Sequence, residues 1–488
     1  MKKILLLTVA AGFVTGCTKD LTSINQDPKT PVSLPSAALF TNAERRLTNT
    51  VTSSNVNLNI FRLVAQYWQE TTYTDESRYD IVTRQIPDNV WDALNRDVLR
   101  NFQEAKNIIV TESTSADAKK NQLAVTDIMM VYTWYYLVTT FGDIPYTESQ
   151  NIKNTFPKYD NQKTIFSDLL MRLDTSILAL NTSAGSFGSA DIIYNGDVKL
   201  WKKFANSLRL KMAMTIADDD PTKAQSEAVA SVTSGVFTSN NDNALFKYVS
   251  SPPNTNPVWV DLVQSGRKDF VANSTIVNIM NATSDPRRPY FFTVDNAGNY
   301  SGNGPGRSSS YATFSKPAGL IKQFNPGDVT DAGKLTYPDF PGDLLDYAEV
   351  EFLLAEAVER GFAVGGTAAG HYNNGVTASI LFWGGSQADA AAYLLQPSVA
   401  YLTATGTYKQ KIGTQKYLAL YNRGWDAWIE QRRLDYPVLP KPSNAASDYP
   451  VRFSYPVNEQ NVNTVNYNAA AAAIGGDDVT TKLFWDKF

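Results

Sequence analysis

The sequence predicts a mainly α-helical fold, in which tetratricopeptide-like helix pairs form a scaffold that supports a loop-rich region with minor β structure. Apolar residues recur at three- and four-residue spacing before about residue 235 and again after about residue 345, as they do on one face of a helix. Between these parts, at about residues 236–343, Gly, Pro, Ser and Asn are frequent, which indicates loops and short strands. The later helices follow one another as pairs, the pattern of a helical repeat.

The first residues, 1–16, predict a lipoprotein signal peptide. Lys2 and Lys3 precede an apolar run at residues 4–14, which is too short to span a bilayer as a helix. Residues 14–17, Val-Thr-Gly-Cys, resemble the lipobox of bacterial lipoproteins, whose cysteine thiol receives a diacylglyceryl group. Cys17 is the only cysteine of the 488 residues, so no disulfide can form within the chain and lipid attachment explains its position. The alternative is an ordinary signal peptide followed by an unmodified cysteine.

Residues 17–35 are polar and contain prolines, which predicts a flexible, lipid-anchored stalk. The formal net charge of −4 becomes −6 when Lys2 and Lys3 leave with the signal peptide. A nucleic-acid-binding protein of this size would carry a basic surface, so this class of function is excluded.

Several helices are predicted before residue 235. Residues 123–138 are almost entirely apolar, but Asp127 interrupts them and they are shorter than a bilayer requires, which indicates a buried helix. Asp197 occupies a plausible N-cap position before the last of these helices. The apolar stripes that define the other helices are Val98, Phe102, Ala105 and Ile109; Ile165, Leu169, Leu173 and Ile177; and Trp201, Phe204, Leu208 and Met212.

The second helical part contains two further stripes and a final pair at residues 410–423 and 425–435, closed by Pro437. The stripes are Leu345, Ala348, Phe352 and Ala355, and then Tyr372, Val376, Ile380 and Trp383. The 34-residue tetratricopeptide consensus is not matched, so an irregular helical domain is the alternative. Because the two helical parts flank the irregular region and need each other for burial, residues 36–488 are expected to form one domain with an insert at about 236–343.

Segments along nearly the whole chain resemble the SusD/RagB family of nutrient-binding outer-membrane lipoproteins. These segments are INQDPKTPVSLPSAALFTNA, YYLVTTFGDIPYTE, FPKYDNQKTIFSDLLMRLD, NGDVKLWKKFANSLRLKMAM, SDPRRPYF, YAEVEFLLAEA, WDAWIEQRRLDYP and TTKLFWDKF. The resemblance implies an outer-membrane, lipid-anchored protein exposed at the cell surface. It also implies a partner, a SusC-type TonB-dependent transporter, and a nutrient ligand, usually an oligosaccharide, that is bound without being cleaved. Only one acidic residue, Asp20, closely follows Cys17, whereas several exported members carry an acidic run there, so the periplasmic and outward-facing leaflets both stay open.

Sugars bind through aromatic rings that stack on their C–H faces and through polar groups that pair with their hydroxyls. Two segments combine both kinds of residue: residues 66–80, QYWQETTYTDESRYD, and residues 256–270, NPVWVDLVQSGRKDF. The predicted ligand-binding residues are Trp68, Tyr73, Asp75, Arg78 and Tyr79 in the first segment and Trp259 and Arg267 in the second. Core packing is the alternative for each aromatic residue, and it is the prediction for Trp134, Trp201, Trp383, Trp425 and Trp428.

Catalysis finds little support in the sequence, and we predict no catalytic residues, no cofactor and no metal. His371 is the only histidine, which argues against a histidine-based triad or a multi-histidine metal site. Asp426, Glu430 and Asp435 have the pattern of helix-surface acids beside Arg432 and Arg433. The sequence GNGPG at 302–306 lacks the strand and helix of a phosphate-binding loop. A loop cation site near residues 475–478, GGDD, a lipid-anchored glycoside hydrolase and a protein-binding helical scaffold are the alternatives left open.

Overall fold

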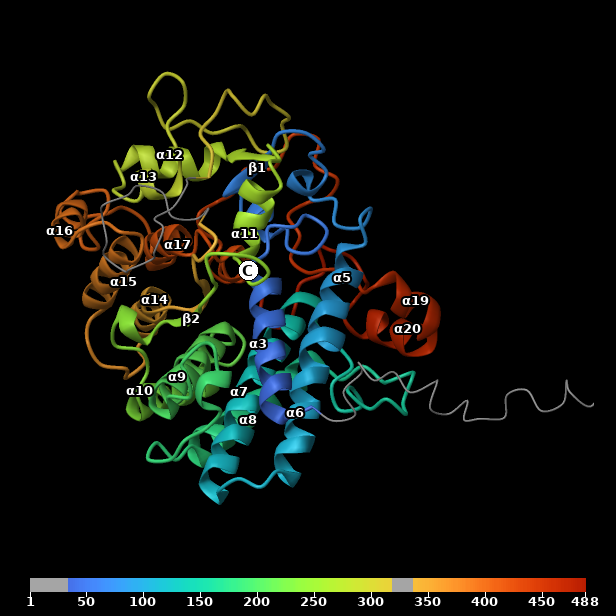
Figure 1. The fold of residues 1–488 in the computed structure, drawn as a ribbon. Helices are drawn as coiled ribbons and strands as arrows, with labels where there is room; N and C mark the ends of the chain where they lie inside the picture. Colours follow the sequence, from blue (N-terminus) through green and yellow to red (C-terminus); the bar gives the residue numbers. More distant parts are fainter. Residues whose placement is uncertain (1–33, 318–336) are drawn as a thin grey trace, which may run out of the picture. The chain divides into compact units, whose positions relative to one another are not determined.

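The computed structural model describes residues 34–317 and 337–488, and Ser36–Phe488 pack as one compact unit (Figure 1). The predicted signal peptide, Cys17 and nearly all of the stalk lie outside the described residues. The prediction of a mainly helical fold with few strands is confirmed.

Long helices form most of the first half of the molecule. They pack largely in chain order, α6 on α7, α7 on α8, α8 on α9 and α9 on α10, and α3 lies against α6. The helices of this part are α3 (Ser36–Thr52), α4 (Phe61–Val64), α5 (Ile86–Asp92), α6 (Arg100–Thr111), α7 (Ala116–Phe141), α8 (Gln162–Ala179), α9 (Val198–Thr215) and α10 (Pro221–Ser234). A π-helical turn, η2 (Ala93–Leu99), joins α5 to α6 without a break.

Helix pairs also form the second half, where the most extensive contact is between α14 and α15. Their helices are α14 (Tyr347–Glu359), α15 (Ala368–Phe382), α16 (Gln387–Leu394), α17 (Tyr408–Ala419) and α18 (Gly424–Leu434), followed by α19 (Val457–Val462) and α20 (Thr464–Ala473). Helix α14 contacts α9, and α18 contributes Trp425 and Trp428 to the same core as α7 and α9. The two helical parts therefore share one apolar core.

The predicted cap and stripes agree with the structure. Asp197 Oδ1 accepts hydrogen bonds from the backbone amides of Lys199 and Leu200, so it caps α9 as expected. The Trp201, Phe204, Leu208 and Met212 stripe is fully buried, and the five tryptophans predicted to pack in the core are 0–2% exposed. Within the described residues, no helix is both long enough and apolar enough to cross a membrane, and α7 is instead a buried central helix.

The region between the helical parts contains short strands and short helices among its loops. Strands β1 (Trp68–Glu70) and β3 (Phe270–Ala272) form one antiparallel pair, and β2 (Ala244–Phe246) and β4 (Gly342–Leu345) form another. The helices of this region are α11 (Pro257–Trp259), α12 (Ser274–Ala282) and α13 (Arg288–Phe291). Figure 1 shows α12, α13 and β1 near one end of this unit, where the long loops gather, and α11 nearer its middle, against α3.

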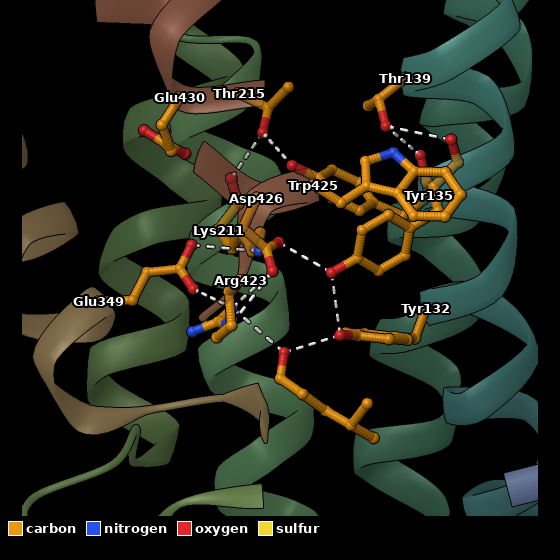
Figure 2. Close-up of polar contacts among 12 residues, drawn as sticks. Tyr132, Tyr135, Thr139, Lys211, Thr215, Glu349, Arg423, Trp425, Asp426 and Glu430 are labelled. Atoms are coloured by element: carbon orange, nitrogen blue, oxygen red, sulfur yellow. Dashed lines mark hydrogen bonds and ion pairs between the residues drawn. The ribbon is translucent and has the colours of Figure 1, made fainter. Parts of the chain in front are cut away.

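A network of buried charges connects the helices of the two parts (Figure 2). Lys211 on α9 contacts Glu349 on α14 and Asp426 on α18, and Arg423 pairs with both of these acids. Tyr136 on α7 donates a hydrogen bond to Asp426 Oδ1 at 2.8 Å. Because each charge has an opposite partner, the helices can pack without leaving an isolated ion in the core.

The interpretation of Asp426 and Glu430 as surface acids is wrong. Asp426 is 3% exposed and Glu430 is 4% exposed, and Arg432 and Arg433 are equally buried. Glu430 pairs with Lys416 at 2.8 Å and with Arg433 at 2.6 Å. These cations hold the pKa of Glu430 below its usual value, although burial alone would raise it.

Candidate functional site

The structure brings the two predicted ligand-binding segments together through the β1–β3 strand pair. Trp68 lies opposite Ala272, Gln69 opposite Val271 and Glu70 opposite Phe270. Beyond this pair, the Thr71 amide donates to the Asp269 carbonyl at 2.8 Å, so the two segments still lie side by side where they leave the strand pair. The loop that follows β1 therefore lies beside the loop that precedes β3, and a third loop is hydrogen-bonded to them, as described below. We call these three loops, residues 71–79, 265–269 and 303–310, the loop platform.

Trp68 and Tyr79 do not face outward on this platform, which corrects the expectation that they offer rings to a ligand. Trp68 is 1% exposed, and its indole nitrogen donates to the Tyr421 hydroxyl at 2.9 Å. Tyr79 is 3% exposed and accepts a hydrogen bond from Gln66 Nε2. Trp68 lies on β1, which is buried along its whole length, and Tyr79 packs in a separate apolar cluster, so both side chains belong to the core.

Tyr73 is the aromatic residue that the platform exposes. Its side chain is 77% exposed, and its backbone has a φ of +53°, in the left-handed region that bulky residues rarely adopt. Gln66, Tyr79 and Gln85 also have positive φ values, so residues 66–85 contain four such positions. Backbone strain of this kind costs of the order of 1–3 kcal/mol per residue and is concentrated at functional sites.

The polar candidates lie on the same loop platform as Tyr73. Arg78 Nε donates to the Gly306 carbonyl at 2.8 Å and is partly exposed. Asp75 is about half exposed and lies 3.8 Å from Arg84. Arg267 is 66% exposed and pairs with Asp269 at 2.5 Å, which leaves part of its guanidinium directed to solvent.

The GNGPG segment at residues 302–306 is a component of the platform that sequence reasoning missed. The Gly306 amide donates to Gln69 Oε1 at 2.9 Å, and the Ser309 amide donates to the Thr71 carbonyl at 2.9 Å. A side chain at Gly306 would collide with the Ser443 carbonyl, and the backbone φ there is +73°. Gly306 thus permits close packing between loops more than 130 residues apart, and nothing in the local sequence signals this partner.

A carboxyl pair lies beneath the platform. Glu70 is 4% exposed, Glu76 is fully buried, and burial followed by the neighbouring Glu76 raises the pKa of Glu70 to about 9. Ser77 donates to Glu70 through its amide and its hydroxyl, and Glu76 pairs with Arg84 Nε at 2.5 Å. Glycosidases hold their two carboxyl groups about 5–9.5 Å apart on either side of the scissile bond, where substrate can reach them, so this buried pair lacks that geometry.

Trp259 lies outside the strand pair, on α11, and is partly buried. The neighbouring Asp261 accepts a hydrogen bond from Ser54 at 2.8 Å, and burial raises its pKa. A cavity of about 370 Å³ opens beside this segment, and its polar lining includes Arg46, Asn49, Ser53, Asn55, Asp97 and Asp261. The structure thus places Trp259 beside a polar cavity, whereas Tyr73, Arg78 and Arg267 lie on the platform.

His371 and the GGDD segment form contacts within the protein. His371 Nδ1 lies 2.7 Å from Glu351 Oε2, and its Nε2 lies 3.2 Å from the Gly365 carbonyl. In the GGDD segment, Asp477 pairs with Arg452 at 2.7 Å. Among residues 34–317 and 337–488, no group of three or more His, Cys, Asp or Glu side chains is arranged to hold a metal ion.

Comparison with known proteins gives one family match and several solved structures. Residues 28–456 match the model of a SusD-like family described as "Starch-binding associating with outer membrane". A structure described as a chitin-binding protein is 28% identical, with a TM-score of 0.77, and covers 93% of this chain and 100% of its own. A SusD homolog from Bacteroides uniformis is 26% identical, with a TM-score of 0.76 and coverage of 92% and 99%. A chitin-binding SusD homolog from Flavobacterium johnsoniae is 25% identical, with a TM-score of 0.75 and coverage of 92% and 98%. No curated protein matches the chain.

Proposed function

The chain belongs to the SusD-like family, and from this membership we propose that it is a lipid-anchored outer-membrane protein that binds oligosaccharides and delivers them to a SusC-type TonB-dependent transporter. Its role is binding and not catalysis. Cys17 carries the lipid, and the helical scaffold holds the ligand-binding surface at the cell envelope. The carboxyl pair Glu70–Glu76 has the wrong geometry for a glycosidase, which supports a binding role.

The proposed ligand is a chitin-type oligosaccharide, that is, a chain of N-acetylglucosamine units. Two of the similar structures are described as chitin-binding, at 28% and 25% identity. Starch-type oligosaccharides are the second class to test, because the family description names starch.

The loop platform is the proposed contact surface, and Tyr73 is the observation that carries it. A ring that is 77% exposed, on a backbone at positive φ two residues after the Thr71 bonds to residues 269 and 309, offers a stacking surface. Arg78 and Arg267 on the same platform supply donors, and Asp75 supplies an acceptor. A shallow surface of this kind binds one sugar segment with a Kd between micromolar and millimolar, corresponding to roughly 4–8 kcal/mol.

The test is a binding screen on the soluble form that begins after Cys17, with chitin-type, starch-type and other oligosaccharides. Tyr73→Ala is expected to weaken binding about tenfold, because one aromatic stacking contact is lost. Phe156→Ala is the matched control, since Phe156 is also an exposed aromatic residue on a loop but lies outside the platform. Cleavage of a sugar, or affinity unchanged by Tyr73→Ala, would contradict the proposal. The anchor and the partner are tested separately, by mass spectrometry of the peptide containing Cys17 and by co-purification with an outer-membrane barrel.

A further inference from the structure

A second polar cavity lies between the end of α18 and the C-terminal segment. Its volume is about 210 Å³, and its polar lining is formed by Gln431, Arg432, Asp435, Tyr449, Lys482 and Asp486. Val438 at its edge is 74% exposed, and Lys482 is about half exposed, so the cavity is open to solvent. None of these residues belongs to the loop platform.

Four polar atoms of this lining have no hydrogen-bond partner among the described residues. They are Gln431 Oε1, Arg432 Nη2, Tyr449 Oη and Asp486 Oδ2. Arg432 and Asp486 are each only 4% exposed. Buried polar groups are nearly always hydrogen-bonded, so four polar atoms without a protein partner in one small cavity indicate that water or a ligand supplies their partners.

Arg432 is held in place by two tryptophan rings and by hydrogen bonds to backbone carbonyls. Its guanidinium lies 3.5 Å from the centre of the Trp428 ring and 4.6 Å from that of Trp485. Its Nη1 donates to the carbonyls of Thr139 and Val451, at 2.9 and 2.7 Å. No carboxylate lies within 4.0 Å of it in the part of the chain that the structure describes, and burial lowers its pKa. The remaining donor, Nη2, therefore has a fixed position in the cavity lining.

The arrangement of charges and atoms selects a class of ligand. The charged side chains of the lining are two cations, Arg432 and Lys482, and two carboxylates, Asp435 and Asp486, and Lys482 pairs with Asp486 at 3.4 Å. The unpaired atoms include a donor (Arg432), two acceptors (Gln431, Asp486) and a hydroxyl that does both (Tyr449). A ligand hydroxyl also donates and accepts, and neighbouring hydroxyls can satisfy an Arg and an Asp together. At about 30 Å³ per water, the space corresponds to roughly seven waters, enough for one sugar ring but not for a chain.

We propose that this cavity binds a single neutral, hydroxylated ring, a monosaccharide or one terminal sugar unit, through Arg432, Tyr449 and Asp486. The site is independent of the loop platform and does not rest on the proposed function. Its unpaired atoms are satisfied by the hydroxyls of the ligand, which replaces the water that hydrates them in its absence.

The test uses the soluble chain with N-acetylglucosamine, glucose, galactose and glycerol as probes, followed by saturation-transfer NMR and calorimetry. Saturable binding of at least one sugar monomer, with a Kd in the millimolar range, is expected. Tyr449→Phe removes only the unpaired hydroxyl, so it should leave the melting temperature unchanged or higher while weakening binding about fivefold. Asp486→Asn is the second variant and should weaken binding in the same way.

Tyr455→Phe is the matched control, because the Tyr455 hydroxyl is also buried and unpaired among the described residues but does not line the cavity. Its affinity for the monomers should equal that of the unmodified chain. Tyr73→Ala should leave monomer binding unchanged, which separates this site from the loop platform. The proposal is overturned if no probe binds saturably, if Tyr449→Phe and Tyr455→Phe behave alike, or if a crystal soaked with the sugar shows only water in the cavity.

Discussion

Lys211 Nζ lies 3.1 Å from Glu349 Oε1, and neither side chain is exposed to solvent. Lys211 also contacts Asp426, while Arg423 pairs with both acids, so two cations balance two carboxylates at the junction of α9, α14 and α18 (Figure 2). Asp426 and Glu349 raise the pKa of Lys211 despite its burial. Arg423 and Lys211 lower the pKa of Glu349, although burial alone would raise it. These groups therefore keep their charges in the core. Removing any one of these charges would therefore leave an opposite charge in the core without one of its partners.

Lys211→Met should destabilise the protein strongly. The substitution keeps most of the length of the side chain but removes the cation that contacts both acids. It leaves Asp426 with Arg423, and Glu349 with Arg423 and the more distant Lys416. Breaking one partner of a buried ion pair costs about 3–5 kcal/mol, and this loss is expected in the free energy of unfolding measured with denaturant. Lys163→Met is the control, because Lys163 is 58% exposed although it pairs with Asp219, and exposed pairs contribute about 0–1 kcal/mol. Equal losses for the two variants would contradict this account of the network.

Glu356 should make the protein sensitive to acid. It is fully buried and pairs with Arg433, which lowers its pKa to about 2 despite the opposing effect of burial. A depressed folded-state pKa gives stability that is present above the unfolded pKa of about 4.3 and is lost as the pH falls through the folded value. Between about pH 4.5 and 2, the free energy of unfolding should fall by about 3 kcal/mol from this group. Glu356→Gln should be less stable at pH 7 and should show a shallower decline in the same range, whereas two parallel curves would argue against the assignment.

The helices, the Asp197 cap and the packed tryptophans could be predicted from the sequence because they depend on neighbours within one or two turns. The environment of Asp426 and Glu430 could not, because a charged stripe on a helix has the same pattern whether it faces water or other charges. Lys211, a partner of Asp426, also lies more than 200 residues earlier in the chain. Residues 195–214, 347–357 and 425–437, which carry much of the family resemblance, supply this buried network. The resemblance therefore identifies the scaffold better than it locates the ligand.

Which of the candidate residues are exposed could be predicted only in part, for a related reason. Trp68 and Tyr73 are five residues apart, and both have polar neighbours in the sequence. Nevertheless, Trp68 is buried on β1, whereas Tyr73 is exposed on the loop that follows. The partner strand β3 lies about 200 residues later, and Tyr73 has a positive φ that its residue type does not signal.

His371 should titrate above its usual pKa. Both ring nitrogens face acceptors, the Glu351 carboxylate at 2.7 Å and the Gly365 carbonyl at 3.2 Å, and only a doubly protonated ring can donate to both. The pKa of His371 is raised by Glu351, which outweighs burial. A raised folded-state pKa gives stability that is complete below about pH 6.5 and is lost as the pH rises through the folded value. Because it is the only histidine, proton NMR of a tag-free chain gives its pKa directly, and a value at or below 6.5 would refute the doubly protonated ring.

Glu70→Gln should stabilise the protein at neutral and alkaline pH. Glu70 and Glu76 are buried against each other, and the pKa of Glu70 is raised to about 9, so the folded state keeps a proton that the unfolded chain releases above about pH 4.5. Each pH unit between these values costs the folded state about 1.4 kcal/mol, whereas a glutamine is neutral throughout and its amide can still donate to Glu76 and accept from Ser77. The variant should unfold at a higher temperature than the unmodified chain at pH 8, by an amount equivalent to about 2 kcal/mol or more, and the difference should vanish near pH 4.

Glu104→Gln, on the exposed face of α6, is the control and should show no such divergence. If the melting curves of Glu70→Gln and the unmodified chain remain parallel from pH 4 to 9, the two carboxyl groups do not share a proton beneath the loop that presents Tyr73.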